Sequence, residues 1–167
     1  MAKIEEQTEN LVNDSLRTTE RIDKETVFAD DPSEMAVKWA GMGAEWLHLV
    51  DLDGALAGES KNIPAIQKIL QTINIPVELG GGIRSMAQIE KLLDMGISRL
   101  ILGSAAVKNP DLIKQASQYF GSQCIVVAID GKRVDNDFYV FIHAGKTNTG
   151  IKLADWVKTV EQNGAGE

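Results

Sequence analysis

Residues 75–85 read IPVELGGGIRS, and this stretch indicates the fold class. The apolar run PVEL is typical of a short buried strand, the glycines that follow suit a turn, and Ser85 can begin a helix. The same succession recurs at VDLDGA (50–55), LGSAAVKNP (102–110) and AIDGKR (128–133). Turns that follow parallel strands meet at one edge of the sheet, where α/β proteins bind ligands. The sequence therefore predicts an α/β protein with a binding edge.

The spacing of apolar segments predicts a parallel sheet of βα repeats. We expect strands at 46–51, 76–79, 99–102 and 124–130, and helices from about 31 and at 63–73, 85–96, 109–121 and 152–163. The strand starts lie about 23 to 30 residues apart, as in right-handed parallel crossovers. The run DND (135–137) followed by FYVFIH predicts a small β-hairpin after the fourth strand.

The expected architecture is one domain over residues 1–167, with the strand order following the sequence. It is half of a (βα)8 barrel, or its rearrangement to a flavodoxin-like three-layer sandwich with helices on both faces. Residues 1–22 contain no apolar strand, and their apolar positions, Ile4 among them, have a spacing closer to that of a helix. We expect this segment to be partly helical and to cover the exposed sheet.

Composition and charge exclude several classes of function. The chain has 167 residues and a net charge of −7, which argues against binding to nucleic acid. The single cysteine, Cys124, lies in an apolar run and cannot form a disulfide within one chain. The polar, acidic start is no signal peptide, and no apolar run is long enough to span a bilayer. We therefore expect a cytoplasmic protein without a membrane partner.

Glycines in two neighbouring turns predict a phosphate site. Gly81, Gly82 and Arg84 follow one predicted strand, and Gly103 and Ser104 follow the next. Glycine lets backbone amides approach an anion closely, and the N-terminus of a following helix adds a favourable dipole. A glycine run alone is often only a tight turn, but two on adjacent strands favour phosphate or a phosphorylated small molecule as ligand.

Carboxylates at the first predicted strand do not indicate a metal centre. Asp51 and Asp53 flank the end of that strand, but no His or Glu spacing completes a ligand set. We interpret both as polar residues at the mouth of the sheet, and His48 as a core or barrel-lining residue. The sequence indicates neither a metal nor a cofactor.

Longer motifs resemble two enzymes of histidine biosynthesis. DKETVFADDPSEMAVKW, GAEWLHLVDLDGALAGESKN, IPVELGGGIRS and LILGSAAVKNPDL, within about 23–112, resemble ProFAR isomerase. FGSQCIVVAIDGKRV, FYVFIHAGKTNTGIKLADWV and GAGE, from about 120 onward, resemble the cyclase subunit of imidazole glycerol phosphate synthase. Both families are (βα)8 barrels, so the resemblance implies a half-barrel of recombined or engineered origin.

The resemblance also implies roles for particular residues. Asp130 matches a catalytic aspartate that transfers a proton in an aminoaldose to aminoketose isomerisation. A purely structural role is the alternative, in which Asp130 caps the turn into Gly131. The families' first-strand aspartate has no match here, so we expect Asp130 to be vestigial and the chain to be inactive but still able to bind phosphate. The alternative is an isomerase completed by a homodimer or by another chain, and a homodimer is expected in either case.

Overall fold

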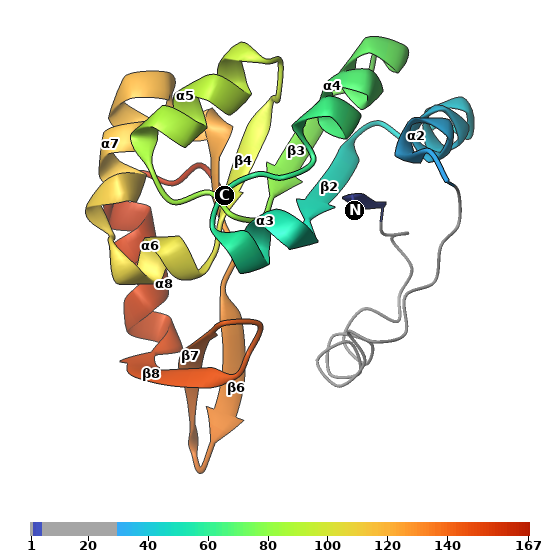
Figure 1. Ribbon diagram of the computed structural model, residues 1–167. Helices are drawn as coiled ribbons and strands as arrows, with labels where there is room; N and C mark the ends of the chain where they lie inside the picture. The colour runs from blue at the N-terminus through green and yellow to red at the C-terminus, as the bar shows by residue number, and fades with distance from the viewer. Residues whose placement is uncertain (1, 5–29) are drawn as a thin grey trace.

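The computed structural model describes residues 2–4 and 30–167, which form two β-sheets with helices packed on the larger one (Figure 1). The larger sheet has five strands in the order β1-β2-β3-β4-β5, and the smaller has three in the order β6-β7-β8. The expectation of a helix in residues 1–22 falls, beyond residues 2–4, outside the described residues.

Four strands of the larger sheet are parallel: β2 (Leu47–Asp51), β3 (Val77–Gly80), β4 (Arg99–Leu102) and β5 (Ile125–Val127). Their register sets Leu49, Leu79, Leu100 and Ile125 side by side, and all four side chains are fully buried. The predicted parallel sheet, with its strand order following the sequence, is thereby confirmed.

The two edges of this sheet have different neighbours. The strand β1 (Ala2–Ile4) runs antiparallel to β2 and pairs Ile4 with Leu49. The expectation that no strand precedes β2, with Ile4 on a helix, was therefore wrong: three residues suffice when an existing edge supplies their hydrogen bonds. At the other edge, Gly166 N–H donates to the Ile125 carbonyl, and Val127 N–H donates to the Glu167 carbonyl, each at 2.9 Å.

Five helices lie where the sequence predicts them: α2 (Pro32–Gly41), α4 (Ile63–Thr72), α5 (Met86–Asp94), α7 (Asp111–Phe120) and α8 (Leu153–Gln162). Two shorter helices, α3 (Leu52–Ala57) and α6 (Ser104–Lys108), follow β2 and β4 and were not predicted. A 3₁₀ turn, η1 (Ser122–Cys124), precedes β5. Helices of five or six residues are too short to show a helical period in the sequence.

The two faces of the parallel sheet differ in burial. One face packs against the helices in a single hydrophobic cluster that includes Leu49, Leu79 and Leu100. On the other face Val50, Ile101 and Val126 are half-buried and belong to no part of that cluster. The expected three-layer arrangement is therefore not what the described residues form. One helical layer on one face is the arrangement of a partial barrel.

The smaller sheet changes the expected path of the chain after β5. Instead of one strand over 124–130, the chain leaves β5 at Val127 and begins β6 (Asp130–Val134). The predicted hairpin is present between β6 and β7 (Asp137–Ile142), and β8 (Thr147–Lys152) adds a third strand that was not expected. Figure 1 shows this small sheet projecting below the larger one.

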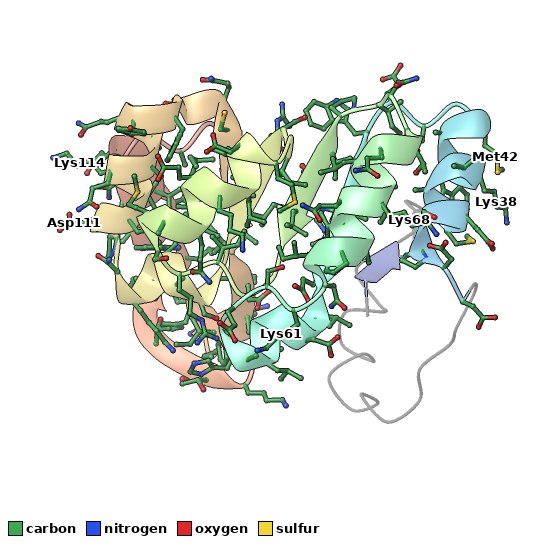
Figure 2. All side chains as sticks on the ribbon, turned by 45° about the horizontal axis from the view of Figure 1, so that its top comes forward. Lys38, Met42, Lys61, Lys68, Asp111 and Lys114 are labelled. Carbon is green, nitrogen blue, oxygen red and sulfur yellow. The ribbon has the colours of Figure 1, made fainter. Side chains whose placement is uncertain are left out.

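An ion pair joins α2 to α4. Asp31 caps α2 by accepting from Ser33 N–H at 3.0 Å. Its second carboxylate oxygen accepts from Lys68, which Figure 2 labels on α4. Hydrogen bonds from Lys68 and from Ser33 lower the pKa of the Asp31 carboxyl to about 2. Because this value lies below the ordinary one, the pair stabilises the folded state above about pH 4 and loses that effect as the pH falls toward 2.

We predict that Asp31→Asn, which keeps the cap but removes the charge, lowers stability at pH 6 and leaves it nearly unchanged at pH 2. Urea unfolding at both pH values measures the difference. Asp94→Asn on α5 is the control, because Asp94 forms no ion pair within the described part of the chain. An equal loss at both pH values would contradict the prediction.

Candidate functional site

Backbone amides without partners gather at the carboxyl ends of β3 and β4. In the β3–α5 turn, the N–H groups of Gly81 and Gly82 find no acceptor among the described residues. The same holds for Gly103 and Ser104, where β4 passes into α6. The pairing of Gly80 with Ile101 sets the two turns beside each other. All four residues are partly exposed, so their amides can meet a ligand from solvent.

The β3–α5 turn requires glycine for a second reason. Gly81 and Gly82 have φ of 105° and 75°, in the left-handed region that favours glycine. A Cβ on Gly81 would lie 2.2 Å from the Asp51 carbonyl oxygen, and one on Gly82 would lie 2.4 Å from that of Gly54. The turn is therefore packed directly against the backbone at the start of α3.

Asp51 lies at the mouth of the sheet, but its carboxylate is buried and accepts several hydrogen bonds. Its side chain is fully buried at the end of β2. The donors to its carboxylate are Gly54 N at 2.9 Å, Ser60 Oγ at 2.6 Å, Lys61 N at 2.9 Å and Asn62 Nδ2 at 2.7 Å. Burial raises the pKa of the Asp51 carboxyl, but these hydrogen bonds outweigh burial and hold the pKa below its usual value.

The second predicted mouth carboxylate, Asp53, is exposed. It lies in the first turn of α3 and accepts from Asn62 Nδ2 at 3.1 Å. Asn62 thus donates to both aspartates, and Lys61 beside it extends outward near α3 (Figure 2). Within the described residues, no cluster of three or more His, Cys, Asp or Glu side chains could hold a metal ion.

Arg84 contacts α3 rather than lying free in the β3–α5 turn. Its guanidinium donates to the Ala55 carbonyl at 3.1 Å. It also lies so close to Gly58 that a Cβ there would be 2.2 Å from an Arg84 nitrogen. The carbonyl groups at the C-terminus of a helix attract a cation, which explains this position. The phosphate-binding role of Arg84 stays a prediction.

Ser104 contacts the loop between β7 and β8. Its hydroxyl accepts from His143 N–H at 3.0 Å, and Lys108 Nζ lies 2.9 Å from His143 Nε2. His143 and Ala144 have φ of 57° and 55°, so this exposed loop makes a left-handed turn. No pattern in the sequence indicates that this loop contacts the β4–α6 turn.

The structure separates Asp130 from the turns that precede helices. Asp130 is the first residue of β6, is exposed, and is paired across the small sheet with Phe141. The prediction that Asp130 ends the fourth strand of the parallel sheet was therefore wrong. The cause is the chain departing from β5 two residues before Asp130, into a second sheet.

Gln88 contributes to the site and was not among the predicted site residues. Ser85 caps α5, with Gln88 N–H donating to Ser85 Oγ at 3.3 Å. The Gln88 amide group also reaches the carbonyls of Gly58 and Gly82. Together with Glu59, Ser60 and Ile83 it lines a cavity of about 150 Å³ between the α3–α4 loop and α5.

Comparison with known proteins gives consistent matches. A family described as "Histidine biosynthesis protein" matches residues 14–167. The 1-(5-phosphoribosyl)-5-((5-phosphoribosylamino)methylideneamino)imidazole-4-carboxamide isomerase of Trichlorobacter lovleyi is 47% identical over 143 residues, which are 86% of this chain and 56% of the relative. The imidazole glycerol phosphate synthase subunit HisF of Natranaerobius thermophilus is 43% identical over 143 residues, 86% of this chain and 57% of the relative. The chain thus spans little more than half the length of these relatives. In the described residues, no helix is long and apolar enough to cross a membrane.

We predict that Asp51→Asn lowers the free energy of unfolding by about 2–3 kcal/mol, because the amide cannot accept from all the donors that the buried carboxylate serves. Denaturant unfolding at pH 7 measures the loss. Asp53→Asn is the matched control two residues away, and its exposed side chain should cost no more than about 0.5 kcal/mol. Equal losses in the two variants would show that the network around Asp51 is not what stabilises the turn.

Proposed function

The chain belongs to the histidine biosynthesis protein family, and on that premise we propose that it is a phosphate-binding half-barrel. The ligand would be inorganic phosphate or a phosphorylated small molecule held at the carboxyl ends of β3 and β4. One observation carries the proposal: the amides of Gly81, Gly82, Gly103 and Ser104 have no partner among the described residues and lie on neighbouring strands. Backbone amides in this arrangement suit an anion.

The local character of such a site explains how an acidic chain would hold an anion. The net charge of −7 repels phosphate, but salt largely screens that repulsion beyond about 8–10 Å. Amide donors act at contact distance, where screening is weak. The ammonium group of Lys108, on the short helix that Ser104 begins, adds positive charge close to one turn. We propose no cofactor and no metal for this binding.

A methyl group placed at the β4–α6 turn tests the phosphate site. We predict that inorganic phosphate shifts the amide NMR signals of Gly81, Gly82, Gly103 and Ser104, and that Gly103→Ala weakens binding about tenfold, equivalent to about 1.4 kcal/mol. Gly103 has open space where a Cβ would stand, and the amide spectrum of the variant without phosphate checks that it folds.

Gly41→Ala is the matched control, because Gly41 ends α2 and also has open space at its Cβ position. Sodium chloride at equal ionic strength controls for salt. The proposal fails if phosphate shifts none of the four amides in the unmodified chain.

A second candidate function is the isomerase reaction itself. The relative from Trichlorobacter lovleyi carries that name, as do further relatives of similar identity. Asp130 would then transfer the proton, and a second copy of the chain or another chain would supply the remaining groups across the uncovered face with Val50, Ile101 and Val126. We propose the homodimer for this role. The recombined or engineered origin remains a prediction, since relatives of both enzyme types match over similar lengths.

Growth of a histidine auxotroph lacking the isomerase distinguishes the two candidates. If the chain is an isomerase, its expression restores growth, and Asp130→Asn abolishes the rescue. If it only binds phosphate, no growth follows although the phosphate-induced shifts persist. Asp135→Asn is the control for a neutral change nearby, because Asp135 is exposed in the β6–β7 turn, and asparagine tolerates its φ of 55°.

A further inference from the structure

Gln88 forms a bridge between two loops that are distant in sequence. Its side-chain amide donates to the carbonyls of Gly58 and Gly82, each at 3.3 Å. Its side-chain oxygen accepts from Arg84 N–H at 2.8 Å and from Ser85 Oγ at 3.2 Å. This half-buried side chain thus uses its amide nitrogen to join the loop after α3 to the β3–α5 turn, and its oxygen on the start of α5.

Asp51 holds the other end of the same loop. Ser60 Oγ and Lys61 N–H, within the segment 58–62, donate to its buried carboxylate. The backbone of Asp51 is also the surface against which Gly81 packs. A closed circuit of contacts therefore runs from Asp51 through the 58–62 loop and Gln88 to Gly82, and back to Asp51 through Gly81.

We propose that Gln88 and Asp51 are positioning residues that hold the Gly81–Gly82 turn in place through the 58–62 loop, and so set its affinity for an anion. The consequence for affinity rests on the proposed phosphate function, whereas the positioning does not. Amide donors that are already held in place bind an anion more tightly, because binding then loses little conformational entropy. The turn's own contacts do not supply this restraint, since the amides of Gly81 and Gly82 have no partner among the described residues.

The simpler role of Gln88 is to cap α5, and two variants separate the roles. Gln88→Met removes the bridge and the contacts that the Gln88 oxygen makes with Arg84 N–H and Ser85 Oγ, and it keeps the bond from Gln88 N–H to Ser85 Oγ. Ser85→Ala removes the cap hydroxyl and its contact with the Gln88 oxygen, but it keeps the bond from Arg84 N–H to that oxygen and both bonds of the bridge. If Gln88 only caps the helix, both variants lose stability and neither changes phosphate affinity. If it positions the turn, Gln88→Met weakens phosphate binding about three- to tenfold, as two lost hydrogen bonds allow, and Ser85→Ala leaves it unchanged.

The experiment records amide NMR spectra of the unmodified chain and both variants, first alone and then with inorganic phosphate, under conditions where all are folded. Without phosphate, positioning predicts that Gln88→Met shifts the amides of 58–61 together with those of Gly81 and Gly82. Shifts confined to 84–89 would overturn the inference. If the unmodified chain binds no phosphate, the proposed function fails while the first spectra still decide the positioning. Equal phosphate affinity in all three proteins would overturn the effect on affinity and leave the phosphate site standing.

Discussion

The carboxylate of Asp51 is withdrawn from water at the end of β2, and the surrounding loops supply the donors that make this tolerable. An unpaired buried charge is costly, so the chain after β2 must return to the same point. It does so twice, at Gly54 in the first turn of α3 and at Ser60–Asn62 before α4. This requirement explains why the segment from β2 to α4 is compact. It also explains why Gly81 packs closely against the backbone of Asp51.

The two faces of the parallel sheet differ in how they are covered. The helical side has a continuous leucine and isoleucine row, and the opposite side carries a different pattern. There His48, Glu78 and Arg99 stand in register across three strands, with His48 Nδ1 2.7 Å from Glu78 Oε1. Beyond them along the strands come Val50, Gly80 and Ile101. A face with polar groups at one end and apolar groups at the other is suited to further packing rather than to full exposure.

The regular part of the fold could be predicted because its residues repeat a local signal. Short apolar runs gave β2 to β4 to within a residue or so, and capping residues such as Asp31 and Ser85 marked where helices begin. The missed features depend on contacts between distant residues. Helix α3 contains Gly54 and has no apolar period, and it forms because Asp51 caps it. The departure of the chain after Val127 depends on the pairing of β6 with β7, which an apolar run through Ile129 conceals.

The candidate site likewise contains residues that local sequence patterns predict and residues that only distant contacts bring together. The glycines of the two turns were predicted from composition, and the structure brings them together, but their binding role stays a prediction. Asp51 was expected to be a polar residue at the mouth of the sheet, and sequence alone does not show that Ser60 and Asn62 fold back onto it. Gln88 lies three residues after Ser85, a spacing found in helix caps, whereas its bridge to Gly58 spans 30 positions and leaves no pattern in the chain.

The two edges of the larger sheet have different backbone partners. An antiparallel β1 on β2 ends the parallel repeat, because the next βα unit could not join that side with the same crossover. The β5 side already bonds to Gly166 and Glu167 through the backbone, and Arg99 Nη1 lies 2.7 Å from the Glu167 carboxylate. Backbone that already pairs with the parallel strands thus borders them on both flanks, so a further parallel strand would first have to displace one of these partners.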